Sequence, residues 1–182
     1  MTDVVLTHLH FDHCGYSTLK NEETGEIYPA FPNATYWVSR RQWDNFLHPN
    51  ALEKDSYFIE NMKAIADNGQ LRLIDTDTEL CPDIDLRLFD GHTPGQIVPY
   101  IHTGGQTFVF AGDVIPLAAS VSPEWISAYD TFPVTSYQEK VRMLEEAARE
   151  SQVLIYCHDA YTRCSTIKKV NDFFKKDKTI EI

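Results

Sequence analysis

The stretch that decides the fold is Thr7-His8-Leu9-His10-Phe11-Asp12-His13. It follows a short apolar run that predicts a buried strand, and in α/β folds functional residues gather where strands end. Four metal-binding side chains within six residues would be costly to bury without a cation. His8 and His10 can converge on one ion, and Asp12 and His13, after a bend, can face a second. A polar loop with incidental histidines is the alternative, but three of the seven histidines in one segment argue against it.

Three further donors lie downstream. His92 sits in Gly91-His92-Thr93-Pro94-Gly95, where glycine and proline predict a tight turn that holds the imidazole. Asp113 follows an apolar strand, and His158 ends another. Each residue taken alone could be structural, as a core histidine, a turn residue or a helix cap. Together with the first cluster they become candidate ligands, and imidazole with carboxylate suits zinc, although manganese, iron and cobalt occupy such sites too.

Composition excludes several classes of protein. The 182 residues suit one domain spanning 1–182, and the net charge of −11 disfavours nucleic acid and anionic membranes as partners. No apolar stretch reaches the roughly 20 residues of a membrane helix. The four cysteines lack a CxxC pair, which favours free thiols in a reducing compartment and a cytoplasmic location. Cys14 and Cys157 adjoin candidate ligands, but a packing role is favoured for both.

The remaining pattern predicts mixed strands and helices. Capping boxes at Ser39/Gln42 and Ser136/Glu139 predict two helix starts, and polar residues 16–33 predict a loop. Further helices are expected at residues 56–67 and around Ile167, Val170 and Phe174. Strands are expected at residues 3–7, 34–38, 71–74, 84–88, 97–101, 107–110 and 153–156, with a hairpin turn at Gly104-Gly105.

The motif set resembles the metallo-β-lactamase superfamily. The matches are the HxHxDH pattern of residues 8–13, His92 in Gly-His-Thr-Pro-Gly, Asp113 after Ala-Gly and His158 at a late strand end. The resemblance implies an α+β fold, a four-layer αββα sandwich with metals at one edge of the two sheets. The family places further strands before HxHxDH, whereas seven residues precede His8 here, so these N-terminal strands are expected to be missing. An incomplete sheet edge would favour homo-oligomer contacts or instability.

The resemblance also implies the role of each donor. One metal would be bound by His8, His10 and His92, a second by Asp12, His13 and His158, and Asp113 would bridge them. Asp12 and Asp113 are the expected catalytic residues, with Asp12 orienting the nucleophile or carrying a proton. Two divalent ions, zinc foremost, would share a hydroxide that attacks a small-molecule ester, lactone or related substrate.

Within the superfamily, residues 31–34 and 48–50 resemble the branch of homoserine lactonases and methyl-parathion-type hydrolases. Lactonases of that branch carry a tyrosine three residues after the bridging aspartate, where this chain has Pro116. Tyr129 could replace it from elsewhere. Residues 16–33 and 117–132 are the expected specificity loops, and Trp125, Tyr129 and Phe132 either line an apolar pocket or pack in the core.

Two alternatives remain open. The chain could be a metal-binding but catalytically impaired fragment, or an iron-dependent redox or thiol-handling relative on the same fold. Flavodiiron relatives carry a glutamate where His10 stands, which disfavours the redox alternative. Nucleic-acid processing relatives are disfavoured by the charge of −11.

Overall fold

The computed structural model describes residues 1–181, which form two compact units. Unit 1 contains Met1–Thr76 and Pro94–Ile97, and unit 2 contains the rest of the described chain. The single domain expected from the sequence stays a prediction. Within residues 1–181, no helix combines the length and the apolar character that crossing a membrane requires.

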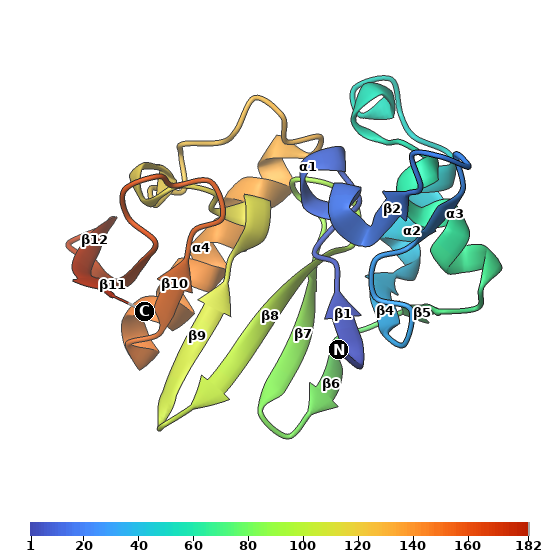
Figure 1. The fold of residues 1–182 in the computed structure, drawn as a ribbon. Coiled ribbons are helices and arrows are strands. Elements are labelled where there is room, and N and C mark those ends of the chain that lie inside the picture. The colour runs from blue at the N-terminus through green and yellow to red at the C-terminus, as the bar shows by residue number, and fades with distance from the viewer. Residues whose placement is uncertain (182) are drawn as a thin grey trace. The chain divides into compact units, whose positions relative to one another are not determined.

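Unit 1 is built on a parallel three-stranded sheet with strand order β1-β4-β5 (Figure 1). The strands are β1 (Asp3–Val5), β4 (Thr35–Ser39) and β5 (Leu71–Ile74). Helices α2 (Arg40–Leu47) and α3 (Glu60–Asp67) connect β4 to β5. Such a crossover is required because parallel strands cannot be joined by a tight turn. Tyr36 and Val38 of β4 are fully buried in the same core cluster as Met62 and Ile65 of α3.

The segment between β1 and β4 holds helix α1 (Phe11–Cys14) and a hairpin of β2 (Thr18–Lys20) and β3 (Ile27–Pro29). The predicted loop at residues 16–33 is therefore wrong in part. The hairpin closes because Asn21 Oδ1 accepts the N–H groups of Glu23 and Thr24, and because Gly25 adopts a positive φ.

Helix α2 of unit 1 begins, and helix α3 ends, at a recognisable sequence signal. The Ser39 hydroxyl accepts the Gln42 N–H at 3.0 Å and caps α2, as predicted. The Gln42 side chain accepts the Leu9 N–H and donates to the Pro94 carbonyl, so it also holds chain segments outside the helix. Helix α3 begins at Glu60, four residues later than predicted, and ends before Gly69, whose φ is +68°.

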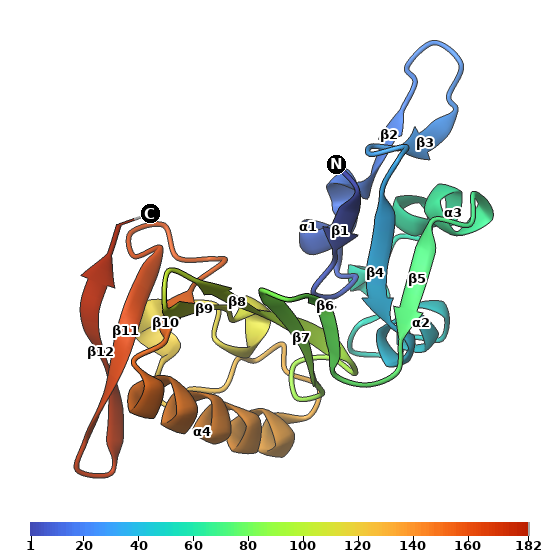
Figure 2. The ribbon, with the colours of Figure 1, turned by 90° about the horizontal axis from the view of Figure 1, so that it is seen from below.

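Unit 2 is a seven-stranded sheet with strand order β12-β11-β10-β9-β8-β7-β6, and helix α4 (Pro133–Glu150) lies along one face (Figure 2). Its strands are β6 (Thr78–Cys81), β7 (Ile84–Phe89), β8 (Gln96–Thr103), β9 (Gln106–Phe110), β10 (Val153–Ile155), β11 (Cys164–Val170) and β12 (Phe173–Ile180). Gly104 and Gly105 both have positive φ and turn β8 into β9, as predicted. Met143, Leu144 and Ala147 bury the inner face of α4.

The predicted C-terminal helix is wrong, because residues 164–180 form the antiparallel hairpin β11–β12. Val170 pairs with Phe173, which leaves a two-residue turn at Asn171-Asp172, and Asn171 adopts the positive φ that such turns require. Ile167 and Phe174 are buried from adjacent strands. Their spacing fits a helix as well as a sheet, and the turn decides between them.

The predicted capping box at Ser136 and Glu139 is also wrong. Helix α4 begins earlier, with Pro133 at its first turn, so both residues lie inside the helix. The Glu139 carboxylate instead accepts the N–H groups of Asp90 and Gly91, each at 2.8 Å. This glutamate therefore ties α4 to the segment that precedes His92.

Candidate metal centre

Unit 1 gathers the imidazoles of His8, His10 and His13. The ring centroid of His8 lies 4.6 Å from that of His10 and 4.1 Å from that of His13. The His10 carbonyl accepts the N–H groups of His13 and Cys14, so the first turn of α1 brings His13 back toward His8. Asp12 Oδ2 lies 3.5 Å from His13 Nε2, and its side chain is 44% exposed, so Asp12 is the donor of this set that solvent reaches.

Backbone contacts fix the chain on both sides of His8. The Ile97 N–H donates to the Thr7 carbonyl at 2.7 Å, and the Leu9 N–H donates to Gln42 Oε1 at 3.3 Å. Since His8 is fully buried and His10 is nearly so, their rings have few orientations open to them. Backbone hydrogen bonds and burial therefore hold the candidate ligands His8 and His10 in place.

Unit 2 brings His92, Asp113 and His158 together. Asp113 Oδ2 lies 3.4 Å from His92 Nε2, while Asp113 Oδ1 lies 3.2 Å from His158 Nε2. Each carboxylate oxygen thus faces a different imidazole, which places the carboxylate of Asp113 between two candidate ligands. Gly112 has φ +52°, so glycine is needed where the chain leaves β9 for Asp113.

The turn that carries His92 is packed tightly against α4. A Cβ added to Gly91 would lie 2.4 Å from the Cα of Ser136, which leaves room for glycine alone. The Glu139 carboxylate binds the Gly91 N–H from the same helix, and burial raises the pKa of Glu139 above its usual range. The Thr131 N–H donates to the His92 carbonyl at 3.0 Å on the other side. Backbone contacts thus hold His92 from two directions.

Two cysteines adjoin these donors, and all four cysteines are free thiols, as predicted. Cys157 Sγ lies 3.2 Å from Asp113 Oδ1, and ligand atoms of Asp113, Cys157 and His158 lie within 4.8 Å of one another. The packing role expected for Cys157 therefore stays a prediction, and the thiol has a polar contact that the sequence did not indicate. Cys14 donates to the Leu9 carbonyl, and burial raises its pKa to about 11, which keeps it a neutral thiol.

The donors fit a divalent metal ion. Metal-bound imidazoles normally place their second ring nitrogen against an oxygen, which fixes the tautomer and the ring orientation. Three of the candidate histidines have such a partner. These pairs are His8 Nδ1 with Thr7 Oγ1 at 3.1 Å, His10 Nε2 with Glu53 Oε1 at 3.2 Å, and His92 Nδ1 with Asp130 Oδ1 at 2.9 Å. Sequence reasoning missed Glu53 and Asp130, because neither belongs to a motif and each pairs with a histidine 38 or more positions away.

A cavity of about 380 Å³ opens beside Asp113 in unit 2. Its lining is largely apolar, and all of its charged residues are acidic; the lining residues are Asp113, Val114, Pro116, Leu117, Ser120, Glu124, Trp125, Ile126, Ser127 and Asp130. Trp125 lines the cavity, as one of the two sequence interpretations expected. Tyr129 and Phe132 are not among the lining residues, and the expectation that Tyr129 supplies a tyrosine in place of Pro116 stays a prediction.

The segment that lines this cavity is tied to α4 by a buried lysine. Lys140 is 1% exposed, and its ammonium donates to the carbonyls of Ser120 at 2.8 Å and Trp125 at 2.7 Å. Burial lowers the pKa of Lys140 to about 8, although the nearby charges of Asp130 and Glu124 act in the opposite direction. The lysine supports the wall of the cavity rather than lining it.

Comparison with known proteins supports the motif interpretation. The sequence profile of the Metallo-beta-lactamase superfamily matches residues 2–158. N-acyl homoserine lactonase AiiA of Bacillus thuringiensis subsp. kurstaki is 24% identical over 162 residues, which are 86% of this chain and 55% of that protein. The N-acyl homoserine lactonase of Bacillus cereus matches with the same identity and the same shares. The chain thus spans about half the length of the curated relatives it matches.

Solved structures share the fold. A probable metal-dependent hydrolase from Staphylococcus aureus superposes with a TM-score of 0.84 and 26% identity, covering 100% of this chain and 64% of that one. AidC, described as a dizinc quorum-quenching lactonase, superposes with a TM-score of 0.77 and 21% identity, covering 100% and 65%. The fold class expected from the sequence is confirmed by these likenesses.

Proposed function

Because the chain belongs to the metallo-beta-lactamase superfamily, we propose that it is a hydrolase whose candidate ligands hold two divalent ions, zinc foremost. The observation that carries this proposal is the Asp113 carboxylate, whose two oxygens face His92 and His158 separately. The dizinc description of AidC supports the choice of metal and the number of ions.

The order of the motifs supports the division of the ligands. We assign His8, His10 and His92 to one ion, Asp12, His13 and His158 to the other, and Asp113 to both. The assignment rests on the sequence pattern and on membership of the family. Within each unit, the imidazole orientations and the second contacts of His8, His10 and His92 are compatible with it.

When bound, two divalent ions supply Lewis acidity and lower the pKa of a shared water from about 15.7 to about 7, which makes a nucleophile available at neutral pH. The carboxylate of Asp113 lies between His92 and His158, so this residue would help to set the positions of the bound ions. Asp12 is the solvent-accessible carboxylate, and its Oδ2 is suited to orient the nucleophile and to take up its proton.

The cavity beside Asp113 supports an uncharged substrate with an apolar group. Leu117, Trp125 and Ile126 offer apolar contacts, whereas Glu124 and Asp130 would disfavour a negative charge on the part of the substrate that lies against them, away from the proposed ions. A small neutral ester or lactone has this character, and the curated relatives are described as N-acyl homoserine lactonases. We therefore infer that substrates bind with their apolar part in the cavity and their carbonyl toward Asp113.

The test is hydrolysis by the zinc-loaded chain of a panel of neutral lactones, esters and phosphotriesters, with matched anionic esters. We expect turnover of at least one neutral compound and weaker turnover of its anionic counterpart. Asp113→Ala should abolish this activity, while Asp177→Ala, at an exposed aspartate that pairs with Lys168, should retain it. Undiminished turnover in Asp113→Ala would overturn the role of Asp113, and no turnover of any compound by the zinc-loaded chain would leave the metal-binding fragment as the better account.

A further inference from the structure

We propose that Glu53 is a positioning residue for His10, whose imidazole it holds through Nε2 so that Nδ1 is presented to a metal ion. This inference rests on the proposed function, because it requires His10 to be a metal ligand. Glu53 belongs to no recognised motif of the chain. It comes from the segment between α2 and α3, 43 positions away from His10.

The contact itself fixes the tautomer of His10. Glu53 is 3% exposed, and its Oε1 lies 3.2 Å from His10 Nε2. A carboxylate oxygen facing Nε2 is placed to accept the proton of that nitrogen, which leaves Nδ1 of His10 for a metal ion. A ring protonated there uses the Nδ1 lone pair to bind a metal.

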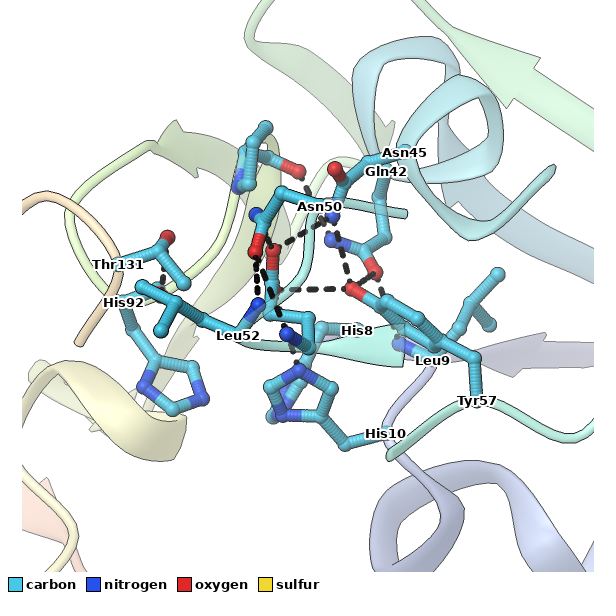
Figure 3. Close-up of polar contacts among 12 residues, drawn as sticks. His8, Leu9, His10, Gln42, Asn45, Asn50, Leu52, Tyr57, His92 and Thr131 are labelled. Atoms are coloured by element: carbon cyan, nitrogen blue, oxygen red, sulfur yellow. Dashed lines mark hydrogen bonds and ion pairs between the residues drawn. The ribbon is translucent and has the colours of Figure 1, made fainter. Parts of the chain in front are cut away.

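The carboxylate of Glu53 is held by three neutral donors besides His10. Asn50 Nδ2 lies 2.5 Å and Asn45 Nδ2 lies 3.0 Å from Glu53 Oε2, while the Tyr57 hydroxyl donates to Oε1 at 3.1 Å (Figure 3). Burying an ionised carboxylate costs free energy unless donors surround it, and here both oxygens have them. The side chain is therefore held in position by hydrogen bonds to both of its oxygens.

The same network reaches the backbone of the histidine segment. The Tyr57 hydroxyl, whose single proton is shared between two acceptors, also lies 3.0 Å from Gln42 Oε1, and that oxygen accepts the Leu9 N–H (Figure 3). The Tyr57 ring also packs 5.1 Å from the His10 ring, centroid to centroid. One group of side chains from α2 and the following segment thus sets both the ring of His10 and the chain that carries it.

A buried charge is an expensive way to stabilise a fold, since apolar residues of the same volume often stabilise as much or more. A negative charge behind a histidine does, however, raise the basicity of its other nitrogen and favour a bound cation. Loss of such a contact typically weakens metal binding by about 10- to 100-fold. We therefore expect Glu53→Gln to lower the affinity for the ion bound by His10 by about that factor.

The experiment measures zinc affinity of the full chain by competition with a chromophoric chelator, together with the visible spectrum of the cobalt-loaded protein. Glu53→Gln should weaken one of the two binding events by about 10- to 100-fold and change the cobalt spectrum, and Glu53→Asp should recover part of the affinity. Glu23→Gln, which removes an exposed carboxylate of the same unit, serves as the matched control and should bind as the wild type does.

The outcomes separate this inference from the proposed function. If the wild-type chain binds no zinc or cobalt, the proposed function fails and the inference fails with it. If the wild type binds two ions and Glu53→Gln binds both with unchanged affinity and spectrum, the inference alone is overturned.

A measurement on the wild type decides the matter even where Glu53→Gln does not fold. Long-range ¹H–¹⁵N correlation spectra of the zinc form should show a protonated Nε2 in the His10 ring. A protonated Nδ1 with an unprotonated Nε2 would contradict the arrangement.

Discussion

Replacing Gly91 with alanine would place a methyl group against the backbone of helix α4. The added Cβ would lie 2.4 Å from the Cα and 2.5 Å from the backbone nitrogen of Ser136. Ordinary van der Waals contact for a Cβ begins at 3.4 Å, so the turn and the helix have to separate by about 1 Å. Neither partner can give way by rotating a side chain, because two of the obstructing atoms belong to the backbone.

The expected cost follows from what that separation disturbs. Overpacking in a filled interior typically costs about 1–3 kcal/mol. The two hydrogen bonds from Glu139 to the N–H groups of Asp90 and Gly91 lie at the same place and would be stretched, so we expect the upper end of this range. For a chain of this size, about 3 kcal/mol corresponds to a fall in Tm of about 6–12 °C. His92 follows directly, so zinc affinity should fall as well.

The assay is thermal unfolding of metal-free protein, followed by zinc titration of the folded variant. Gly15→Ala is the control, because φ at Gly15 is −59° and the nearest atom to its added Cβ lies at 3.9 Å. That variant should match the wild type or gain about 0.4–1 kcal/mol through the unfolded state. Equal Tm and equal zinc affinity in Gly91→Ala and Gly15→Ala would refute the packing argument.

Three further outcomes are expected. Burial holds the pKa of Lys140 at about 8, below the 10.5 of an ordinary lysine, so between these two pH values the unfolded chain binds more protons than the folded chain. From pH 8 to 10.5, the unfolding free energy of the wild type should therefore rise by about 3 kcal/mol relative to that of Lys140→Met, measured by urea titration at each pH. The same pH dependence in both proteins would contradict the shift. Ser151, which ends α4 with φ 55°, is strained there, so Ser151→Gly should raise the unfolding free energy by about 1 kcal/mol, and an unchanged or lower value would count against strain. If the Cys157 thiol only donates a hydrogen bond to Asp113, the cobalt-loaded protein should lack an intense thiolate-to-metal absorption band. A band that is present in the wild type and absent in Cys157→Ser would instead show that Cys157 coordinates the metal directly.

Local sequence signals identified much of the fold, because their partners lie close in the chain. Ser39 and Gln42 are three residues apart and form the predicted N-terminal cap, and Gly104 and Gly105 supply the positive φ of the predicted turn. The β11–β12 hairpin was missed because Ile167 and Phe174 satisfy a helical spacing as well as a strand pairing. The turn at Asn171 settles the choice, and its signal is a single dipeptide.

The residues of the candidate metal centre also divide into those that a local sequence pattern identifies and those that depend on contacts between distant residues. His8, His10 and His13 could be selected from the sequence because metal binding concentrates donors in one segment. Glu53 could not, since its role depends on a fold that brings residues 43 positions apart into contact. Glu139 shows the same limit, because its capping-box spacing to Ser136 was a local coincidence and its partners are the N–H groups before His92.

The most direct test of the two-ion proposal is a crystal structure of the zinc-loaded chain with anomalous diffraction data collected at the zinc edge. We expect two peaks per chain, both contacted by the carboxylate of Asp113. The remaining contacts should divide as His8, His10 and His92 to one ion and Asp12, His13 and His158 to the other. A single peak, or two peaks of which only one contacts Asp113, would contradict a centre bridged by this residue.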